Sequence, residues 1–454
     1  MKRVLRFVTW NVNGLRAVLQ RLEQSLEQFL EGLESDIICL QETKMTRSEL
    51  DQELVRPPGF DAFYSFCRHR GGYSGVVTFV KSGLPTVAAE EGLTGLWQTS
   101  DSVGHVGSLH NELSSRLVNE LETEGRCVIT DHQAFVLLNT YCPALASADR
   151  LEYKLQFHAL IEDRVKALRD AGKRVIVVGD INIAHREIDH CEPDAYRYEG
   201  VSFADHPCRR WMDAFVGEPE ETEQNSSLKR NRGEAEDMVP ATKMVDAFRH
   251  FHPKQTKAFT CWNTQTGARK TNYGTRIDYI LVDPAFLECV YSCSIEPERL
   301  GSDHCPVMMS CTVELKTDAS TNVGNPAALC AKNFVEFSGT QQSIKAFVVR
   351  KDSTNESVNT ANGSGHAHAK SAPSDRLAPR PKSRIARGQQ SITSFFSHAG
   401  AKRKSPSPVL KVGDNWGRKF YVCTKPAGEK GNPDARCDFF KWADNKCNKK
   451  PKAP

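Results

Sequence analysis

The chain has 454 residues, of which 39% are hydrophobic and 26% are charged, a composition typical of a soluble globular protein. Residues 381–454 carry 17 Lys or Arg against 5 Asp or Glu, a net +12, which leaves 43 against 51, or −8, for residues 1–380. A basic tail on an acidic body indicates a partner rich in phosphate, with a merely solvated tail as the alternative.

Several classes of protein are excluded by what the sequence lacks. Its 15 cysteines are scattered and do not have the spacing of a disulfide framework. No run reaches the ~18 apolar residues that a membrane span requires. The apolar pattern from Val4 leads into a charged helix rather than a signal peptide. We therefore expect reduced thiols, a cytosolic or nuclear location and no membrane partner.

The first 315 residues read as a series of strands with few helices. Many strands and long loops favour two packed sheets flanked by helices. Residues 98–124 and 217–243 are polar and aperiodic, which indicates surface insertions. In chain order we predict a strand over residues 4–10, one helix over 15–33, strands over 36–42, 74–80 and 134–141, a long helix over 153–168, and strands over 175–180, 277–282, 290–295 and 306–313.

The strand over 175–180 is the centre of this pattern. Four β-branched residues in succession predict a strand buried on both faces. It ends in Gly179-Asp180, and Asn182 follows two residues later, so the two polar side chains point the same way in extended chain. Such a pair can orient a water or hold an oxygen-rich substrate, although Asp and Asn also simply favour caps and turns.

Five strand ends in this region share polar groups suited to phosphate and metal. Hydrolysis of a phosphodiester needs a cation, a base for water and donors that stabilise the developing charge. Oxygen ligands such as a carboxylate suit Mg²⁺. Taken singly, each group has a plainer explanation as a surface carboxylate, an ion-pair partner or a packing residue. The five ends are Asn11-Val12-Asn13, Gln41-Glu42-Thr43-Lys44, Asn139-Thr140-Tyr141, Gly179-Asp180-Ile181-Asn182, and Arg276-Ile277-Asp278 together with Ser302-Asp303-His304.

These motifs, in this order, resemble the exonuclease III family of apurinic/apyrimidinic endonucleases. The resemblance extends over residues 1–315. It implies a four-layered α/β sandwich and Mg²⁺-dependent cleavage of DNA, with Mn²⁺ as a substitute, at the 5′ side of abasic sites or at 3′-blocking groups. The quoted motifs are Trp10-Asn11-Val12-Asn13-Gly14-Leu15-Arg16, Leu40-Gln41-Glu42-Thr43-Lys44, Gly179-Asp180-Ile181-Asn182-Ile183, Arg276-Ile277-Asp278-Tyr279 and Gly301-Ser302-Asp303-His304.

The resemblance also implies a role for each site residue. Asp180 positions or activates the attacking water, and Asn182 holds that water or a phosphate oxygen. His304, oriented by Asp278, contacts the scissile phosphate, and Tyr141 assists at the phosphate or leaving group. The metal group comprises Asn13, Glu42, Asp180, Asn182, Asp303 and His304, with Asn11 supporting Glu42.

Three positions depart from the family pattern. Many members have Asp where this chain has Asn13, so the site loses one formal negative charge. Ala144 stands where an Asn often follows the Tyr-x-Pro pattern, and Thr275 stands where abasic-site specialists often carry Trp. These departures favour trimming of 3′ ends over incision at abasic sites.

The chain changes character after Leu315. Residues 316–388 are rich in polar residues and proline and predict a disordered linker. Gln389, Ile392, Phe395 and Phe396 resemble the motif that binds the sliding clamp PCNA, in which a short turn presents an apolar plug. The alternative is an accidental apolar island in the linker.

A segment at residues 413–450, after a basic linker over 397–412, resembles a GRF-type zinc finger, a module that grips single-stranded nucleic acid. A structural zinc normally takes four Cys or His ligands. Cys423 and Cys437 supply two, and no cysteine lies between Cys330 and Cys423, so half of the site is missing. Binding of Zn²⁺ therefore stays open, with an unfolded basic tail as the alternative.

Together these features predict a nuclear DNA repair nuclease, with a mitochondrial fraction as the alternative, that acts in base excision repair and the damage response. Its expected substrates are recessed 3′ ends and abasic duplex, and its tail is expected to bind single-stranded DNA. PCNA and checkpoint proteins are the expected protein partners. Two other functions stay open, a clamp-bound adaptor and a phosphatase for small phosphoesters or phosphoinositides on the same fold.

Overall fold

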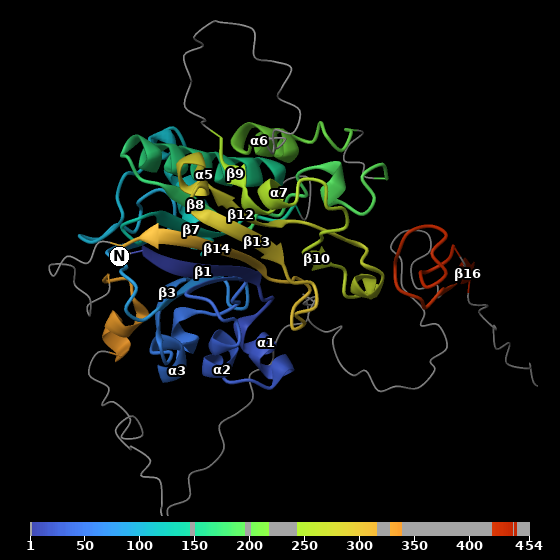
Figure 1. The fold of residues 1–454 in the computed structure, drawn as a ribbon, viewed down its shortest axis with the longest axis horizontal. Helices are drawn as coiled ribbons and strands as arrows, with labels where there is room; N and C mark the ends of the chain where they lie inside the picture. The colour runs from blue at the N-terminus through green and yellow to red at the C-terminus, as the bar shows by residue number, and fades with distance from the viewer. Residues whose placement is uncertain are drawn as a thin grey trace, which may run out of the picture.

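The computed structural model describes residues 2–145, 150–195, 201–217, 243–315, 327–337, 420–438 and 440–442. Two six-stranded sheets pack face to face, and helices cover their outer faces (Figure 1). One apolar cluster fills the space between the sheets, and two others lie between each sheet and its helices. The predicted four-layered α/β sandwich is confirmed.

The first sheet brings the ends of its two parallel strands to one edge. β1 runs parallel to β2 and antiparallel to β14, and Asn11 lies opposite Gln41 in the β1–β2 register. The polar residues that follow these two strands therefore emerge together. In sheet order the strands are β13 (Val290–Ile295), β14 (Val307–Glu314), β1 (Lys2–Asn11), β2 (Ile37–Gln41), β4 (Val76–Lys81) and β3 (Phe60–Ser65).

The second sheet places three site residues side by side. β8 is parallel to β7 and antiparallel to β12, so Asp180 lies opposite both Tyr141 and Asp278. Every residue of β8 is buried, as its β-branched run predicts. In sheet order the strands are β5 (Ala88–Glu91), β6 (Cys127–Asp131), β7 (Val136–Tyr141), β8 (Val175–Asp180), β12 (Asp278–Val282) and β9 (Val245–Asp246).

The helices close the outer faces of the two sheets. The first sheet is covered by α1 (Leu15–Leu22), α2 (Leu26–Glu31) and α3 (Gln52–Val55), and the second by α5 (Leu151–Asp170), α6 (Pro207–Phe215) and α4 (Ser115–Thr123). Two short helices, α7 (Ala247–Phe251) and α8 (Pro284–Leu287), each insert a phenylalanine into the cluster between the sheets. Within the described residues no helix is long and apolar enough to cross a membrane.

The single helix predicted over residues 15–33 is wrong, because the chain breaks it into α1 and α2. The Ser25 hydroxyl accepts a hydrogen bond from the Gln28 N–H, and the Gln28 side chain accepts one from the Ser25 N–H. This capping box starts a new helix. Glu23 ends α1 with a left-handed backbone, at φ 54°.

Part of the segment predicted as a linker packs on the first sheet. Residues 327–337 contain two 3₁₀ turns, η7 (Ala331–Asn333) and η8 (Val335–Phe337). Cys330 forms a β-bridge with Phe63 and is buried, and Ala331 joins the cluster under the helices. A few buried residues suffice to hold such a segment, and they leave no periodic pattern in the sequence.

The last described residues form a small two-stranded sheet. β15 (Phe420–Val422) and β16 (Phe440–Trp442) pair antiparallel, with Tyr421 opposite Lys441. The surface insertion predicted over 217–243 falls almost wholly outside the described residues. The region over 98–124, also predicted as an insertion, contains η2 (Leu109–Asn111) and α4, whose Leu121 is buried.

A buried ion pair fixes α5 to the second sheet and gives the first testable prediction. The Arg164 guanidinium donates to both Glu90 carboxylate oxygens, at 3.2 and 2.8 Å, and both side chains are fully buried. Glu90→Gln leaves the guanidinium without a counter-charge, so we expect the free energy of unfolding to fall by ~3–5 kcal/mol in urea titrations. The double variant Glu90→Leu with Arg164→Met should regain most of this loss, and no recovery would contradict the explanation.

Candidate active site

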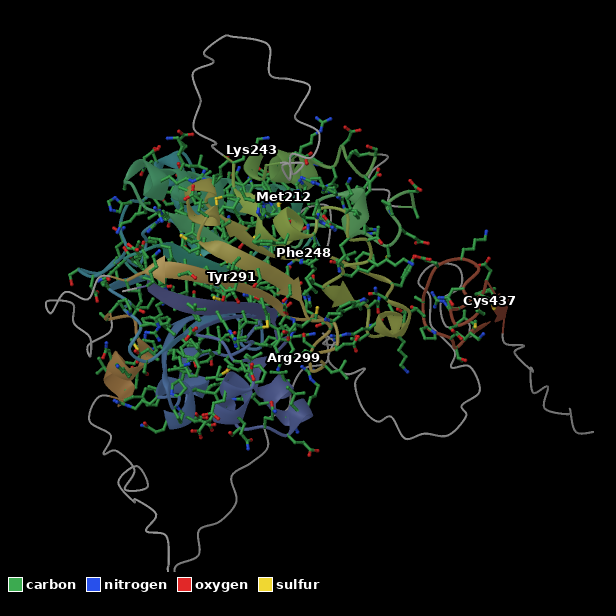
Figure 2. All side chains as sticks on the ribbon, viewed as in Figure 1. Met212, Lys243, Phe248, Tyr291, Arg299 and Cys437 are labelled. Atoms are coloured by element: carbon green, nitrogen blue, oxygen red, sulfur yellow. The ribbon has the colours of Figure 1, made fainter. Side chains whose placement is uncertain are left out.

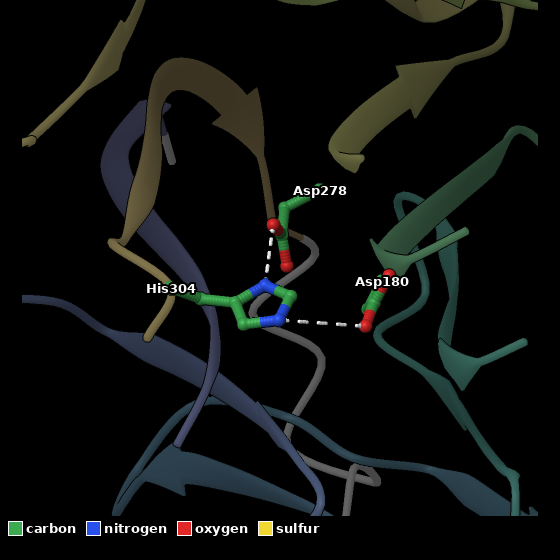
Figure 3. A group of neighbouring side chains, drawn as sticks. All are labelled: Asp180, Asp278 and His304. Carbon is green, nitrogen blue, oxygen red and sulfur yellow. Dashed lines mark hydrogen bonds and ion pairs between the residues drawn. The ribbon is translucent and has the colours of Figure 1, made fainter. Parts of the chain in front are cut away.

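The polar ends of β1, β2, β7, β8 and β12 meet the loop before β14 at one edge of the sandwich. At the centre lie two carboxylates and an imidazole (Figure 3). His304 Nδ1 lies 2.8 Å from Asp278 Oδ2, and His304 Nε2 faces Asp180 Oδ2 at 4.0 Å. Within the described residues this is the only cluster of three or more His, Cys, Asp or Glu side chains with metal-binding geometry.

Burial and mutual charge set the protonation of this cluster. Burial, followed by repulsion from Asp278, raises the pKa of Asp180 to about 7. Burial alone would lower the pKa of His304, but the Asp278 carboxylate raises it well above its ordinary value. The imidazole is therefore held as a cation between two carboxylates, and Asp180 titrates near neutrality.

Asn11 joins the two sheets at this centre. Its Nδ2 donates to Glu42 Oε1 and to Asp180 Oδ2, each at 2.9 Å, and its Oδ1 accepts from the Asn13 N–H. The role expected for Asn11, support of Glu42, therefore agrees with its contacts. The same amide also orients Asp180, which the sequence did not indicate.

Asn13, Lys44 and Asp303 form a second group beside the first. Asn13 Nδ2 donates to Asp303 Oδ1 at 2.9 Å, and the Lys44 ammonium bonds both Asn13 Oδ1 and Glu42 Oε2, the latter at 2.9 Å. Burial opposes ionisation of Glu42, but Lys44 and Asn11 lower its pKa overall. Burial likewise opposes ionisation of Asp303, whose pKa is lowered by His304 and Asn13.

Tyr141 and Asn182 complete the set from the ends of β7 and β8. The Asn182 N–H donates to Asp180 Oδ1 at 2.8 Å, and its Nδ2 donates to Cys142 O at 2.9 Å. Burial and the charge of Glu42 raise the pKa of Tyr141, so its hydroxyl stays protonated. The structure thus brings together all nine residues predicted for the nuclease centre, Asn11, Asn13, Glu42, Tyr141, Asp180, Asn182, Asp278, Asp303 and His304.

Left-handed backbone at three strand ends turns these side chains into the site. Asn13, Glu42 and Asn182 have φ of 48°, 52° and 56°. This conformation costs an ordinary residue energy, although Asn tolerates it best. Strain of this kind persists where the surrounding structure fixes it, and it is frequent at functional sites.

A cavity of about 140 Å³ adjoins the centre beside Asn182. Thr275, the residue that stands in place of an expected Trp, lines it and pairs with His190 through a β-bridge. Lys154, His190, His206 and Arg209 also line it, but burial lowers the pKa of both histidines, and Lys154 and Arg209 donate to backbone carbonyls.

Lys154 is a positioning residue that sequence reasoning missed. It lies on the buried face of α5, and its ammonium donates to Pro143 O at 2.6 Å and to Ile181 O at 3.3 Å. It therefore ties together the turns that follow Tyr141 and Asp180. The signal was available, because Lys154 precedes Phe157 and Ile161 by three and seven residues, on the apolar stripe of the predicted helix.

The remaining predicted site residues lie elsewhere. Gln389, Ile392, Phe395 and Phe396 fall outside the described residues. Backbone N–H groups of Lys425 and Cys437 lower the pKa of the Cys423 thiol, an environment that favours a thiolate. Among the described residues no third zinc ligand joins Cys423 and Cys437.

Comparison with known proteins decides the family. Residues 8–304 match the endonuclease/exonuclease/phosphatase family, and residues 401–446 match the GRF zinc finger. The chain belongs to the endonuclease/exonuclease/phosphatase family. A DNA-(apurinic or apyrimidinic site) endonuclease 2 of Xenopus laevis is 35% identical to it, over 97% of this chain and 99% of that protein. The Homo sapiens protein of the same name is 32% identical over the same shares.

A solved structure agrees with this membership. The crystal structure of the catalytic domain of the Xenopus laevis endonuclease 2 superposes with a TM-score of 0.62 and 37% identity, and it covers 74% of this chain and all of that domain. The resemblance to apurinic/apyrimidinic endonucleases expected from the five motifs is confirmed, and the matched relatives are those named endonuclease 2.

Lys154→Met tests the positioning role in this member of the family. Methionine fills the same volume but leaves the two turns untied, so we expect the single-turnover rate to fall roughly 10- to 100-fold while DNA binding changes little. The matched control is Lys166→Met, which removes an exposed lysine from the same helix. Equal rates for the two variants would show that Lys154 does not position the site.

Proposed function

We propose that this protein is a Mg²⁺-dependent DNA repair nuclease that hydrolyses phosphodiester bonds at 3′ ends, as a 3′–5′ exonuclease and 3′-phosphodiesterase, and incises more weakly 5′ to abasic sites. The observation that carries the proposal is the buried Asp278–His304–Asp180 cluster, which supplies a cationic donor and a carboxylate of neutral pKa at one point. The names of the relatives support DNA as the substrate.

The carboxylates around Glu42 suit a hard divalent cation. Glu42 and Asp303 have lowered pKa values. The Lys44 ammonium, itself a cation, lies between Glu42 and Asn13 and donates to both. Asp278 Oδ1 is buried and without a hydrogen-bond partner. Glu42, Asp303 and Asn13 would hold Mg²⁺, with Asp180, Asn182 and His304 close by, and the ion would neutralise charge on the phosphate. Mn²⁺ would substitute with the same oxygen ligands.

Asp180 is the base in this proposal. Its two oxygens accept hydrogen bonds from the Asn182 N–H and the Asn11 amide, which fix the orientation of the carboxylate. A carboxylate with a pKa of about 7 accepts a proton from water more readily than an ordinary aspartate. The attacking water would lie between Asp180 and the Asn182 side chain.

His304 and Tyr141 stabilise charge on the phosphate and the leaving oxygen. His304 is held as a cation by Asp278, and its Nε2 faces the site. Tyr141 keeps its proton and can donate a hydrogen bond to an oxygen atom. Donors fixed before the reaction need no rearrangement as negative charge develops.

Preference for 3′ ends follows from the pocket beside Asn182. Because Thr275 stands where a Trp would be expected, the wall offers a small hydroxyl side chain and the Asn182 amide in place of an aromatic face for a flipped-out sugar. Such a wall can hydrogen-bond a 3′ terminus but does not stack on a sugar. Weak incision at abasic sites follows from the same substitution and from the neutral Asn13.

The remaining parts of the proposal concern partners and location. Gln389, Ile392, Phe395 and Phe396 would bind PCNA, which would stimulate the nuclease in base excision repair and the damage response. The basic tail, in which Cys423 and Cys437 would contribute to a Zn²⁺ site, would bind single-stranded DNA in the nucleus. Checkpoint proteins are further proposed partners. The intact catalytic cluster favours an enzyme over a clamp-bound adaptor.

The deciding experiment compares two labelled duplexes with purified protein and Mg²⁺, one with a recessed 3′ end and one with an internal abasic site. We expect faster shortening of the recessed end. Asp180→Asn, which keeps the size of the side chain but replaces one of its two acceptor oxygens and removes the base, should lower the rate by at least roughly 100-fold. Chelation of the metal should abolish both reactions. Faster incision at the abasic site would contradict the proposed preference, and inactivity on both duplexes would favour the adaptor or the small-phosphoester phosphatase.

The pH dependence of the rate tests the role of Asp180. The base works as the carboxylate, so the single-turnover rate should rise with pH and level off above a pKa of about 7. The His304 cation lowers the pKa of Asp180, so residual activity of His304→Gln should level off at a higher pH. An inflection that disappears in His304→Gln would assign the titration to the imidazole instead.

A further inference from the structure

Arg126 is a buried cation to which the proposed hydrolysis assigns no role. Side chains fill the space around the two sheets (Figure 2), and only 2% of Arg126 is exposed. Arg126 comes immediately before β6 and lies opposite Tyr141 at the end of β7, where its carbonyl accepts from the Tyr141 N–H at 2.8 Å. A guanidinium is costly to bury unless its donors are satisfied, so the partners of this one are informative.

All three nitrogen atoms of the Arg126 guanidinium donate to different partners. Nη1 donates to the Tyr141 carbonyl at 2.9 Å, Nη2 to the Tyr73 hydroxyl at 2.8 Å, and Nε to the Glu124 carboxylate at 2.6 Å. The guanidinium carbon also lies 4.8 Å from the centre of the Tyr141 ring. The side chain therefore folds back onto its neighbour and contacts both the backbone and the ring of Tyr141.

These contacts restrict the Tyr141 ring in a way that only an arginine can. A cation placed over an aromatic ring is attracted to its face, so tilting the ring away costs energy. The planar guanidinium presents its donors in fixed directions, whereas a lysine ammonium is a point charge on a flexible stem. With both its backbone and its ring held, Tyr141 has a set direction for its hydroxyl.

The contact with Tyr73 extends the arrangement to a neighbouring loop. Residues 66–75, here called the Tyr73 loop, follow β3. The Gly75 N–H donates to Gly125 O at 3.2 Å, and the Gly75 carbonyl accepts from the Thr43 N–H at 3.0 Å. The Tyr73 loop therefore joins the guanidinium to the turn that follows β2, which carries part of the catalytic centre.

Arg150 offers a comparison within the same cluster of charges. It also pairs with Glu124, at 3.3 Å, and its guanidinium carbon lies 4.1 Å from the centre of a tyrosine ring, that of Tyr153. Tyr153 belongs to α5 and is not one of the residues of the catalytic centre. The two arginines thus share one carboxylate and differ in the tyrosine that each one holds.

We propose that Arg126 is a positioning residue, which fixes Tyr141 as a donor to the phosphate or the leaving oxygen and ties it to the Tyr73 loop. Arg126 acts through Tyr141 and does not itself touch the reacting atoms. The catalytic part rests on the proposed nuclease function, whereas the fixing of Tyr141 does not.

Fluorine NMR of the full chain tests the fixing of Tyr141. In protein made with meta-fluorotyrosine, the resonance of Tyr141 is identified by its absence in Tyr141→Phe. Arg126→Met should move this resonance toward the position of free fluorotyrosine and cause exchange between ring orientations, because the ring loses the contact that holds it. Arg150→Met is the matched control, which should affect the resonance of Tyr153 and leave that of Tyr141 unchanged.

Single-turnover rates on a duplex with a recessed 3′ end test the catalytic part. Arg126→Met should lower the rate roughly tenfold with little change in DNA affinity, because the donor is misplaced. In a Tyr141→Phe background the same substitution should lower the rate by less than about twofold, since no hydroxyl remains to be positioned. Arg126→Lys should behave like Arg126→Met, because it keeps the charge but not the fork of donors.

Tyr73→Phe is a milder variant that does not alter the buried cation. It removes one of the three acceptors of the guanidinium at a half-buried position. We expect the rate to fall roughly threefold, and to fall only while Tyr141 keeps its hydroxyl. Should Arg126→Met fail to fold, the resonance of Tyr141 and the rates in Tyr73→Phe decide both parts of the proposal.

The outcomes separate the two parts. A Tyr141 resonance that is unchanged in Arg126→Met overturns the fixing. Equal falls in rate with and without the Tyr141 hydroxyl overturn the catalytic part, because they indicate a general loss of structure. A wild-type protein that does not shorten the recessed end overturns the proposed nuclease function, and the catalytic part with it, while the resonance still decides the fixing.

Discussion

A single buried amide, that of Asn11, makes the rest of the site possible. Asp180 and Glu42 come from different sheets, and two carboxylates drawn together in a poorly solvated place repel each other. Asn11 donates one N–H to each and so fixes their separation. A second amide pair, Gln41 and Asn139, joins the same two sheets at 2.8 Å nearby. Hydrogen bonds thus join the two sheets at the edge where charged residues follow the strands.

Hydrogen bonds at the same edge also hold the turns that follow β7 and β8. A turn in left-handed conformation at Asn182 would relax if its neighbours allowed it. Lys154 prevents this by binding Ile181 O, and the Asn182 amide binds Cys142 O. Asp180 is therefore oriented by the Asn11 amide, by the Asn182 N–H and by the fixed turn that follows it. Burial in this place is the main reason that its pKa is raised.

The sequence predicted the long strands and the centre because both depend on local pattern. The run before Asp180 could form only a buried strand, and polar ends of parallel strands meet at one edge. β3, β6 and α7 were missed: α7 has five residues, too few for a helical period, whereas β3 and β6 are as long as strands that were predicted but lack four β-branched residues in succession, as β8 has. Asn11 as a bridge to Asp180, and Lys154 as a tie between turns, depend on contacts 169 and 27 residues apart along the chain. The helical spacing could place Lys154 on the buried face of its helix, but spacing cannot reveal which carbonyls it binds or that Asn11 reaches Asp180.

The balance of charge separates this centre from an ordinary buried network in the same domain. Near α7, Asp189 and Asp246 are matched by Arg249 and Arg276, and the group is neutral in itself. At the site the carboxylates outnumber the cations that pair with them directly, since among the described residues Glu42, Asp180, Asp278 and Asp303 have only Lys44 and His304 as ion-pair partners. With Asp180 ionised, the surplus in these direct pairs is two negative charges, which one divalent cation would neutralise. If the site served stability alone, we would expect its carboxylates to be matched by cations, as they are in the network near α7. The uncompensated charge is therefore the feature that marks this edge as a place for a metal and a phosphate.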